Sequence, residues 1–413
     1  MTSEREQPQQ PDSIAATSAS PVASTNSGIP RRNLLKGATV GAVTVGAAAV
    51  GALGGLTLPA HMAAAQARTS TVNSSPNNNK PSSFKFSLEQ AEPQVFAGGT
   101  NRNATAANIE ELSGIAMSSV HINPGGMHEL HWHMNASELS FCLSGQGEIG
   151  IFLSGQQNAI IPILPGSTTF VPIGATHYIR NTGTDVLHVV ETFSNENPEH
   201  IDFSEALGLI PRNLLAQTFG LQTQDFPALP VQSDQFLVQT GMVPAKTSTL
   251  AGGPFTVNVN DIAPVLSPGG FVNNVTPLLI PGLDLISLVH LQAQPGGLRE
   301  PHWHPNSAEL NYCVQGNAQI EIITPDHTHE VFQVQPGDVA FVPQNYFHYI
   351  SSTSDEPLIF LVFFANKAPN HIDLSQLMSF FPRDLFAASF GSNLHIFDAI
   401  PNLSDVVLAA PVS

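Results

Sequence analysis

The chain has 413 residues, a length that corresponds to two or three domains. It carries 14 Lys and Arg against 32 Asp and Glu, and the net charge of −18 excludes the basic surface needed to bind nucleic acid or an anionic membrane. Only 11% of the residues are charged, while 33 Pro and 32 Gly indicate short elements and many turns rather than long helical bundles. The 16 His are the unusual feature of this composition, and their positions guide the functional interpretation.

The N-terminal region has the composition of an export signal. A polar segment ends in Arg31 and Arg32, a weakly apolar run follows over residues 37–60, and Ala65-Gln66-Ala67 has the small-x-small pattern of a cleavage site. Paired arginines before such a run resemble a bacterial twin-arginine (Tat) signal. The resemblance implies that residues 1–67 are a signal peptide and that the Tat translocase exports the protein to the periplasm, the cell envelope or the medium, with no membrane anchor after cleavage.

A membrane span is the alternative for this run, because residues 37–60 are long enough to cross a bilayer. Five Gly between positions 41 and 55 make the run only weakly apolar, which favours the signal. Residues 68–83 are rich in Thr, Ser, Asn and Pro, and we expect them to form a flexible leader.

The rest of the chain repeats itself without a gap at an offset of 171 residues. This offset places Phe84 on Phe255, Pro124-Gly125-Gly126 on Pro295-Gly296-Gly297, and His200-Ile201-Asp202 on His371-Ile372-Asp373. The sequence therefore predicts two homologous domains, over residues 84–220 and 255–391. A linker over 221–254 joins them, and a C-terminal tail follows over 392–413.

Each repeated unit has the pattern of an all-β domain. Short alternating runs, such as 140–143 in the first unit and 319–322 in the second, are separated by Gly and Pro turns. We therefore expect each unit to form a β-barrel.

The end of each unit departs from this pattern. Segments such as 203–207 and 211–216 predict short helices, for which Ser204 and its repeat equivalent Ser375 are the expected N-caps. We expect these appended helices to contact a neighbouring barrel.

Each unit also carries three His and one Glu at identical spacing. A His-x-His pair on a strand points both imidazoles to the same side, a Glu follows five residues later, and another His lies 39 residues beyond the Glu. Three neutral imidazoles and a carboxylate form a mixed N/O site suited to Mn(II), Fe(II), Zn or Cu. The predicted ligands are His131, His133, Glu138 and His177 in the first unit and His302, His304, Glu309 and His348 in the second. A purely structural role for these histidines would have to arise twice at the same spacing.

The spacing of these residues resembles the two motifs of the cupin family. The first unit matches every fixed position, as Gly125-x5-His131-x-His133-x4-Glu138-x6-Gly145 and Gly166-x5-Pro172-x-Gly174-x2-His177-x3-Asn181. The second unit repeats the first motif, but in its second motif Asn345 replaces Gly and Ser352 replaces Asn. The resemblance covers nearly all of 84–391 and implies an all-β bicupin. Its two double-stranded β-helix (jelly-roll) barrels would each hold a metal ion and carry short appended helices.

Two tryptophans indicate which branch of the cupin family the chain resembles. Trp132 and Trp303 each lie between the paired histidines, and the segment 295–306 is similar to the oxalate decarboxylase branch of the cupins. That branch implies a carbon–carbon lyase that splits oxalate, or a similar small dicarboxylate, into formate and CO2. It also implies Mn(II), two ions per chain, with dioxygen as co-catalyst, and assembly as a homo-oligomer, a trimer or hexamer. The ligand types alone leave Fe and Zn open.

The same resemblance assigns roles in catalysis to further residues. Arg299 occupies the position of the oxalate-clamping cation, where its equivalent in the first unit is His128, a weaker and pH-dependent substitute. The first unit has an acidic segment that starts at Glu191, in which Glu196 or Glu199 would manage the proton. The second unit has no acid at these positions, so each unit carries part of the catalytic set, and catalysis is expected in the first.

Two other functions stay open on the sequence. Oxidation of the same acid to CO2 and hydrogen peroxide is favoured where the acidic segment is missing, as in the second unit. A metal-binding or storage cupin without any reaction would keep the ligands alone.

Overall fold

The computed structural model describes residues 82–154, 158–232, 235–241, 254–391, 393–403 and 406–411. The predicted signal peptide, most of the predicted leader and part of the predicted linker lie outside these residues. Within the described part of the chain, no helix has both the length and the apolar character that crossing a membrane requires.

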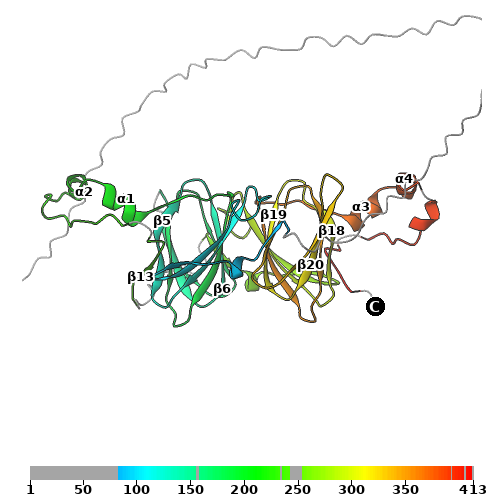
Figure 1. Cartoon of the computed structure of the whole chain (residues 1–413), viewed down its shortest axis with the longest axis horizontal. Helices are drawn as coiled ribbons and strands as arrows, with labels where there is room; N and C mark the ends of the chain where they lie inside the picture. Colours follow the sequence, from blue (N-terminus) through cyan, green and yellow to red (C-terminus); the bar gives the residue numbers. More distant parts are fainter. Residues whose placement is uncertain are drawn as a thin grey trace, which may run out of the picture. The chain divides into compact units, whose positions relative to one another are not determined.

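The described chain forms two barrels of antiparallel strands, each built from a seven-stranded and a six-stranded sheet (Figure 1). We call them barrel 1 and barrel 2 in chain order. This arrangement confirms the expected all-β fold of two jelly-roll barrels with short appended helices.

Barrel 1 contains the predicted metal ligands of the first repeat. Its seven-stranded sheet has the order β14 (Thr256–Asn258), β9 (Ser167–Val171), β6 (Glu138–Ser144), β11 (Leu187–Phe193), β4 (Ala116–Ile122), β3 (Gly99–Ala104) and β2 (Gln94–Phe96). Its six-stranded sheet has the order β12 (His200–Asp202), β5 (Gly126–His133), β10 (Thr176–Asn181), β7 (Gly147–Phe152) and β8 (Asn158–Ile163), and β13 (Leu237–Gln239) also pairs with β5.

Barrel 2 repeats this topology. Its seven-stranded sheet has the order β1 (Lys85–Phe86), β22 (Val339–Val342), β19 (Glu309–Gln315), β24 (Leu358–Phe364), β17 (Ser287–Ala293), β16 (Gly270–Val275) and β15 (Val265–Ser267). Its six-stranded sheet has the order β21 (His329–Val334), β20 (Ala318–Ile323), β23 (Phe347–Ser352), β18 (Leu298–Trp303) and β25 (Ile372–Asp373), and β26 (Leu408–Ala409) also pairs with β18.

The two repeats exchange one strand each. Strand β1, from the start of the first repeat, pairs with β22 of barrel 2, and β14, from the start of the second repeat, pairs with β9 of barrel 1. Apolar residues from both repeats, among them Met117 and Phe341, belong to one buried cluster. The barrels are therefore joined by backbone hydrogen bonds and by apolar packing, beyond the chain connection itself.

Two segments that the sequence analysis placed outside the repeated units return to the barrels. Strand β13 comes from the predicted linker and β26 from the predicted tail, and each pairs with the strand that carries the His-x-His pair. Leu237 and Leu408, at matching repeat positions, are buried there, so each barrel gains a short covering strand.

In the described part of the chain, four helices follow the strands as predicted and lie outside the strands of their own barrels (Figure 1). They are α1 (Phe203–Leu209), α2 (Arg212–Thr218), α3 (Leu374–Phe380) and α4 (Arg383–Ser389), with single 3-10 turns η1 (Leu88–Gln90), η3 (Val259–Asp261) and η4 (Leu394–Phe397).

The predicted helix caps are wrong. Ser204 and Ser375 are the second residues of α1 and α3, and the hydroxyl of Ser204 donates to the Glu129 carboxylate while that of Ser375 donates to Glu300. The reason is that strands β5 and β18 offer a carboxylate within reach, so each serine ties its helix to the barrel.

Candidate metal centres

The metal cluster of barrel 1 is assembled by strand register. Strand β5 carries His131 and His133, and its pairing with β10 places His177 directly opposite His131. Glu138, the first residue of β6, comes from the other sheet. All four side chains are buried, and their ligand atoms lie within 4.8 Å of one another.

Barrel 2 builds the same cluster from the same positions. His302 on β18 lies opposite His348 on β23, His304 follows the end of β18, and Glu309 begins β19. These ligand atoms also lie within 4.8 Å of one another, and the side chains are buried. The structure therefore brings together all eight residues that the spacing predicted as ligands.

Backbone carbonyls fix the tautomer of most of these imidazoles. A carbonyl oxygen can only accept a hydrogen bond, so an Nδ1 bonded to it carries the proton and Nε2 presents its lone pair to the cluster. Such bonds run from His131 to Glu129 (2.8 Å), from His177 to Ala175 (3.0 Å), from His302 to Glu300 (2.7 Å), from His348 to Tyr346 (2.9 Å) and from His304 to Asn370 (2.8 Å). Metal-ligating histidines are typically oriented in this way.

The carboxylates complete the two clusters. In barrel 1, Oε2 of Glu138 lies 3.2 Å from Nε2 of His133 and 3.0 Å from Nε2 of His177. Burial would raise the pKa of Glu138, but the neighbouring imidazoles of His177 and His133 outweigh it and hold that pKa well below its usual range. The carboxylate therefore stays ionised and supplies negative charge to the cluster.

The donor set fits a divalent transition metal. Among the described residues, Nε2 of His131 and Oε1 of Glu138 are buried without any hydrogen-bond partner, as is Nε2 of His348 in barrel 2. Buried lone pairs that converge without a proton between them are satisfied by a cation. Three imidazoles and one carboxylate suit Mn(II), Fe(II) or Zn.

Comparison with protein families agrees with this geometry. The family model described as Cupin matches the chain twice, over residues 86–225 and 257–394. The chain belongs to the cupin family. The first match lies on the repeat that carries the barrel 1 cluster, and the second on the repeat that carries the barrel 2 cluster.

Several curated and solved proteins resemble this cupin over both barrels. Oxalate decarboxylase OxdC of Bacillus subtilis (strain 168) is 26% identical over 316 residues, which cover 74% of this chain and 82% of that protein. A probable oxalate decarboxylase of Arthroderma benhamiae is 24% identical over 339 residues, covering 78% and 82%. The structure of the Bacillus subtilis oxalate decarboxylase at pH 4.6 superposes with a TM-score of 0.73 at 23% identity, covering 81% of this chain and 89% of that one.

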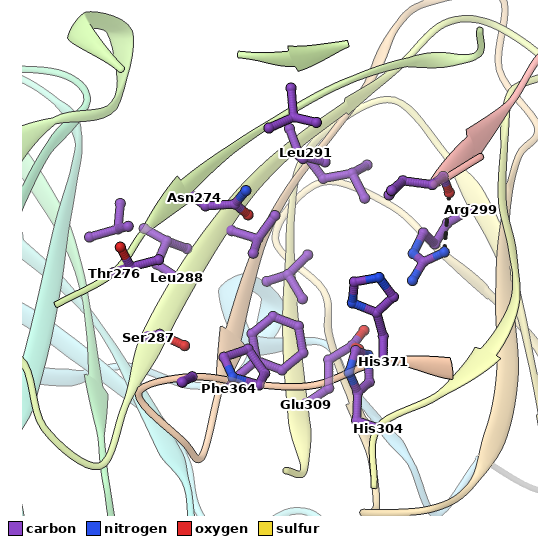
Figure 2. A pocket seen from close by; sticks show the side chains of 18 of the residues that line it. Asn274, Thr276, Ser287, Leu288, Leu291, Arg299, His304, Glu309, Phe364 and His371 are labelled. Carbon is purple, nitrogen blue, oxygen red and sulfur yellow. Dashed lines mark hydrogen bonds and ion pairs between the residues drawn. The ribbon is translucent and has the colours of Figure 1, made fainter. Parts of the chain in front are cut away.

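A cavity opens onto each metal cluster of this cupin. The cavity of barrel 1 has a volume of about 420 Å³, and polar side chains form much of its wall. The cavity of barrel 2 is about 800 Å³, and apolar side chains dominate its wall. Figure 2 shows Leu288, Leu291 and Phe364 on that wall, with His304 and Glu309 at its base.

His128 and Glu191 form a buried pair in the cavity of barrel 1. Nδ1 of His128 lies 3.3 Å from Oε1 of Glu191, and both side chains are almost wholly buried. Burial lowers the pKa of His128 well below its usual value, so the imidazole is neutral and does not supply the positive charge that we expected of it. Burial and the charge of Glu138 raise the pKa of Glu191 well above its usual range. The prediction that Glu191 belongs to the acidic segment is wrong, because Glu191 lies on β11, which carries it into the barrel.

The two acids predicted to manage the proton are not among the residues that line this cavity. Oε2 of Glu196 accepts a hydrogen bond from the backbone N–H of Gly114 at 2.9 Å, and Glu199 is exposed. Their neighbours Asn197 and Pro198 line the cavity instead. The roles of Glu196 and Glu199 stay predictions.

Arg299 lines the cavity of barrel 2, but it is paired. Its Nη2 donates to Oδ1 of Asp373 at 2.9 Å, and its Nη1 donates to the carbonyl of Val407 at 3.2 Å. Asp373 is buried and lies 74 residues from Arg299 in the chain, so local spacing does not predict this pair. These bonds use two of the five N–H groups of a guanidinium, so the head group can still donate toward the cavity.

A third His and Glu cluster lies where the two barrels meet. Glu89 on η1 contacts His121 on β4 and His188 on β11, and its carboxylate also accepts hydrogen bonds from Ser119 and from Tyr312 of barrel 2. None of the three cluster residues has a His or Glu at its repeat equivalent, so the repeat could not reveal them. The hydroxyl donors on the carboxylate indicate a structural junction.

Proposed function

We propose that this cupin is an exported, Mn(II)-dependent enzyme that splits oxalate, or a similarly small dicarboxylate, into formate and CO2 in barrel 1. The observation that carries the proposal is the small polar cavity on the barrel 1 cluster, which holds the buried carboxyl group of Glu191 beside the neutral imidazole of His128. Relatives named oxalate decarboxylase support it, as does a similar solved structure, that of the Bacillus subtilis oxalate decarboxylase with its Mn(II) centres.

The proton balance of the reaction gives Glu191 its role. Conversion of the oxalate dianion into formate and CO2 consumes one proton, which must reach the carbon that becomes formate. The carboxyl group of Glu191 can hold this proton because burial raises its pKa, and its Oε2 is free of hydrogen bonds to the other described residues. His128 fixes Oε1, so that Oε2 is the oxygen left to act.

Mn(II) held by the four ligands of barrel 1, with dioxygen as co-catalyst, would supply the electron-transfer chemistry and would bind the substrate carboxylate. The cavity walls exclude bulk water from the buried pair. Closure of the segment that carries Glu196 and Glu199 would complete this enclosure and is the step in which either acid would reach the cavity.

Export belongs to the same proposal. Tat substrates cross the membrane folded, so the metal would be bound in the cytoplasm, where availability rather than affinity selects it. The replacement of Arg31 and Arg32 by Lys should leave the protein in the cytoplasmic fraction. Unchanged export of that variant would contradict the Tat route.

Carbon-13 NMR of labelled oxalate tests the activity directly. The mature chain from Arg68, loaded with Mn(II), is incubated in air at mildly acidic pH. Formate and CO2 in equal amounts support decarboxylation, whereas CO2 with hydrogen peroxide would indicate the oxidase alternative. Unchanged oxalate, with manganese measured in both barrels, would contradict both activities and leave a metal-binding cupin.

A further inference from the structure

The cavities of the two barrels differ in chemistry although their metal clusters match. The barrel 2 cavity is about 800 Å³, close to twice the 420 Å³ of the barrel 1 cavity. Oxalate has four oxygens on two carbons and no apolar body, so it uses neither this volume nor an apolar wall. A cavity of this size and character is typical of a site for a larger and largely apolar small molecule.

The difference is concentrated at four matched positions. Polar residues that line the cavity in barrel 1 are each replaced by valine at the 171-residue offset, so that the same strands present apolar side chains to the cavity of barrel 2. The pairs are Gln94 and Val265, Asn101 and Val272, Ser118 and Val289, and Glu191 and Val362.

In barrel 1 these polar residues form a hydrogen-bonded wall. Nδ2 of Asn101 donates to Gln94 and to Asn103, and the hydroxyl of Ser118 donates to Asn103 at 2.7 Å. Such a wall favours a ligand that is polar over its whole surface. The valines of barrel 2 offer no hydrogen bonds, so they disfavour such a ligand and favour apolar surface.

Polar groups remain at the base of the barrel 2 cavity. The metal ligands His304 and Glu309 lie there, and Arg299, three residues before His302, lines the cavity as well (Figure 2). The exposed side chains of Leu266 and Leu278 add apolar surface to the cavity wall. A ligand that matches this cavity has an anionic head group, which lies at the base, and an apolar body, which lies along the valine wall.

We infer that barrel 2 binds a monocarboxylate with an alkyl or aryl body, its carboxylate at the metal cluster and Arg299 and its body against Val272, Val289 and Val362. The inference rests on the metal site proposed for barrel 2, but it does not require decarboxylation in barrel 1. The two barrels would then recognise different acids.

Calorimetric titration of the Mn(II)-loaded protein, with oxygen excluded, tests this binding. Acetate, butanoate, hexanoate and octanoate are the probes, with oxalate for comparison. Affinity should rise by about fourfold for each added methylene group, as for transfer of CH2 out of water. The carbon-13 carboxyl signal of bound octanoate should relax faster than its methyl signal, because the carboxylate lies nearer to Mn(II).

A matched pair of variants locates the site. The double variant Val272→Asn with Val289→Ser introduces the residues that barrel 1 has at these positions, Asn101 and Ser118. In barrel 1 both of these donate hydrogen bonds to Asn103. The equivalent Asn274 can accept the same two hydrogen bonds in the variant. This variant should fold and should lose octanoate affinity by about tenfold. The control, Asn101→Val with Ser118→Val in barrel 1, should leave the high-affinity octanoate site unchanged.

Affinity that is independent of chain length, or octanoate binding that is equally tight in Val272→Asn with Val289→Ser, would overturn the inference. Oxalate turnover measured on the same samples separates it from the proposed function. Turnover without octanoate binding contradicts the inference alone, and octanoate binding without turnover contradicts decarboxylation alone.

Discussion

At the scale of single residues, one repeat position decides whether a barrel has a buried carboxyl group that can donate a proton. Glu191 on β11 and Val362 on β24 occupy the same place above matching metal clusters. A buried carboxyl group whose pKa is raised can deliver a proton, whereas a valine cannot. The same fold therefore offers proton transfer in one barrel and apolar contact in the other.

We predict that Glu191→Gln lowers the rate of formate production by 10²- to 10⁴-fold, the usual worth of a general acid. Because the pKa of Glu191 is raised, the wild-type rate should be full at low pH and should fall as pH rises through that pKa. The variant should lose this limb of the pH profile while retaining its manganese, as measured by metal analysis. Glu196→Gln and Glu199→Gln are the comparison variants; if they abolish formate while Glu191→Gln is fully active, the proton resides in the acidic segment.

The buried ion pair of Arg299 and Asp373 gives a second prediction at the scale of single residues. Removal of the guanidinium in Arg299→Met leaves the buried Asp373 carboxylate with only the imidazole of His371, 3.6 Å away, as an ion-pair partner, which should destabilise barrel 2 by about 3 kcal/mol. Urea unfolding followed by fluorescence in a Trp132→Phe background reports barrel 2, because Trp303 is then the remaining tryptophan. Asp373→Asn keeps a hydrogen-bond acceptor for the guanidinium and should lower the free energy of unfolding by less than Arg299→Met does. A free energy of unfolding that is unchanged in Asp373→Asn would contradict a charge-pair role, because that variant removes the counter-charge of the guanidinium but keeps the hydrogen-bond acceptor.

At the scale of elements, the exchanged strands and η1 hold the barrels together. The backbone N–H of Glu89 donates to the carbonyl of Gly337 in barrel 2 at 3.1 Å, while its side chain contacts His121 and His188 of barrel 1. Burial would raise the pKa of Glu89, but hydrogen bonds from His121, His188 and Ser119 outweigh it and hold the pKa far below its usual range. The junction therefore contains an ionised carboxylate.

We expect Glu89→Gln to destabilise the protein by about 1–2 kcal/mol at pH 7, a modest value because the carboxylate is partly open to solvent. A depressed folded pKa stabilises the protein above the unfolded value of about 4.3 and loses this contribution as pH falls below it. The difference between variant and wild type, measured by urea unfolding, should therefore shrink between pH 5 and pH 3. A difference that is constant with pH would contradict the electrostatic origin.

Much of this fold and of both metal clusters was predictable from the sequence, because the repeat shows each ligand twice and a His-x-His pair on a strand has a fixed geometry. The Glu89 junction was not predictable, since it is absent from the second repeat and depends on a strand that crosses between barrels. The pairing of Arg299 with Asp373 links residues 74 apart in the chain, and neither local spacing nor composition reports it. The replacement of polar residues by valine in the second repeat is visible in the sequence. Only the structure shows that these residues line the two cavities.

At the scale of the whole molecule, the appended helices expose apolar residues at matching repeat positions. Leu209 ends α1 with 66% of its surface exposed, and its equivalent Phe380 ends α3 with 80% exposed. Phe219 and Phe390, which follow α2 and α4, repeat the pattern at 66% and 72%. Exposed apolar side chains that recur in both repeats are typical of an assembly surface, so we propose that the helices mediate the expected trimer or hexamer.

The double variant Leu209→Ser with Phe380→Ser should shift the protein toward monomer, because it removes apolar surface that association would bury. Light scattering coupled to size-exclusion chromatography gives the mass of wild type and variant at equal concentration. Leu164→Ser is the control, since Leu164 is 51% exposed but lies outside the helices and has a polar repeat equivalent, Gln335, so its replacement should leave the mass unchanged. The metal content of the variant should match wild type, because the ligands lie inside the barrels. A wild-type monomer at micromolar concentration, or a variant of unchanged mass, would contradict assembly through the helices.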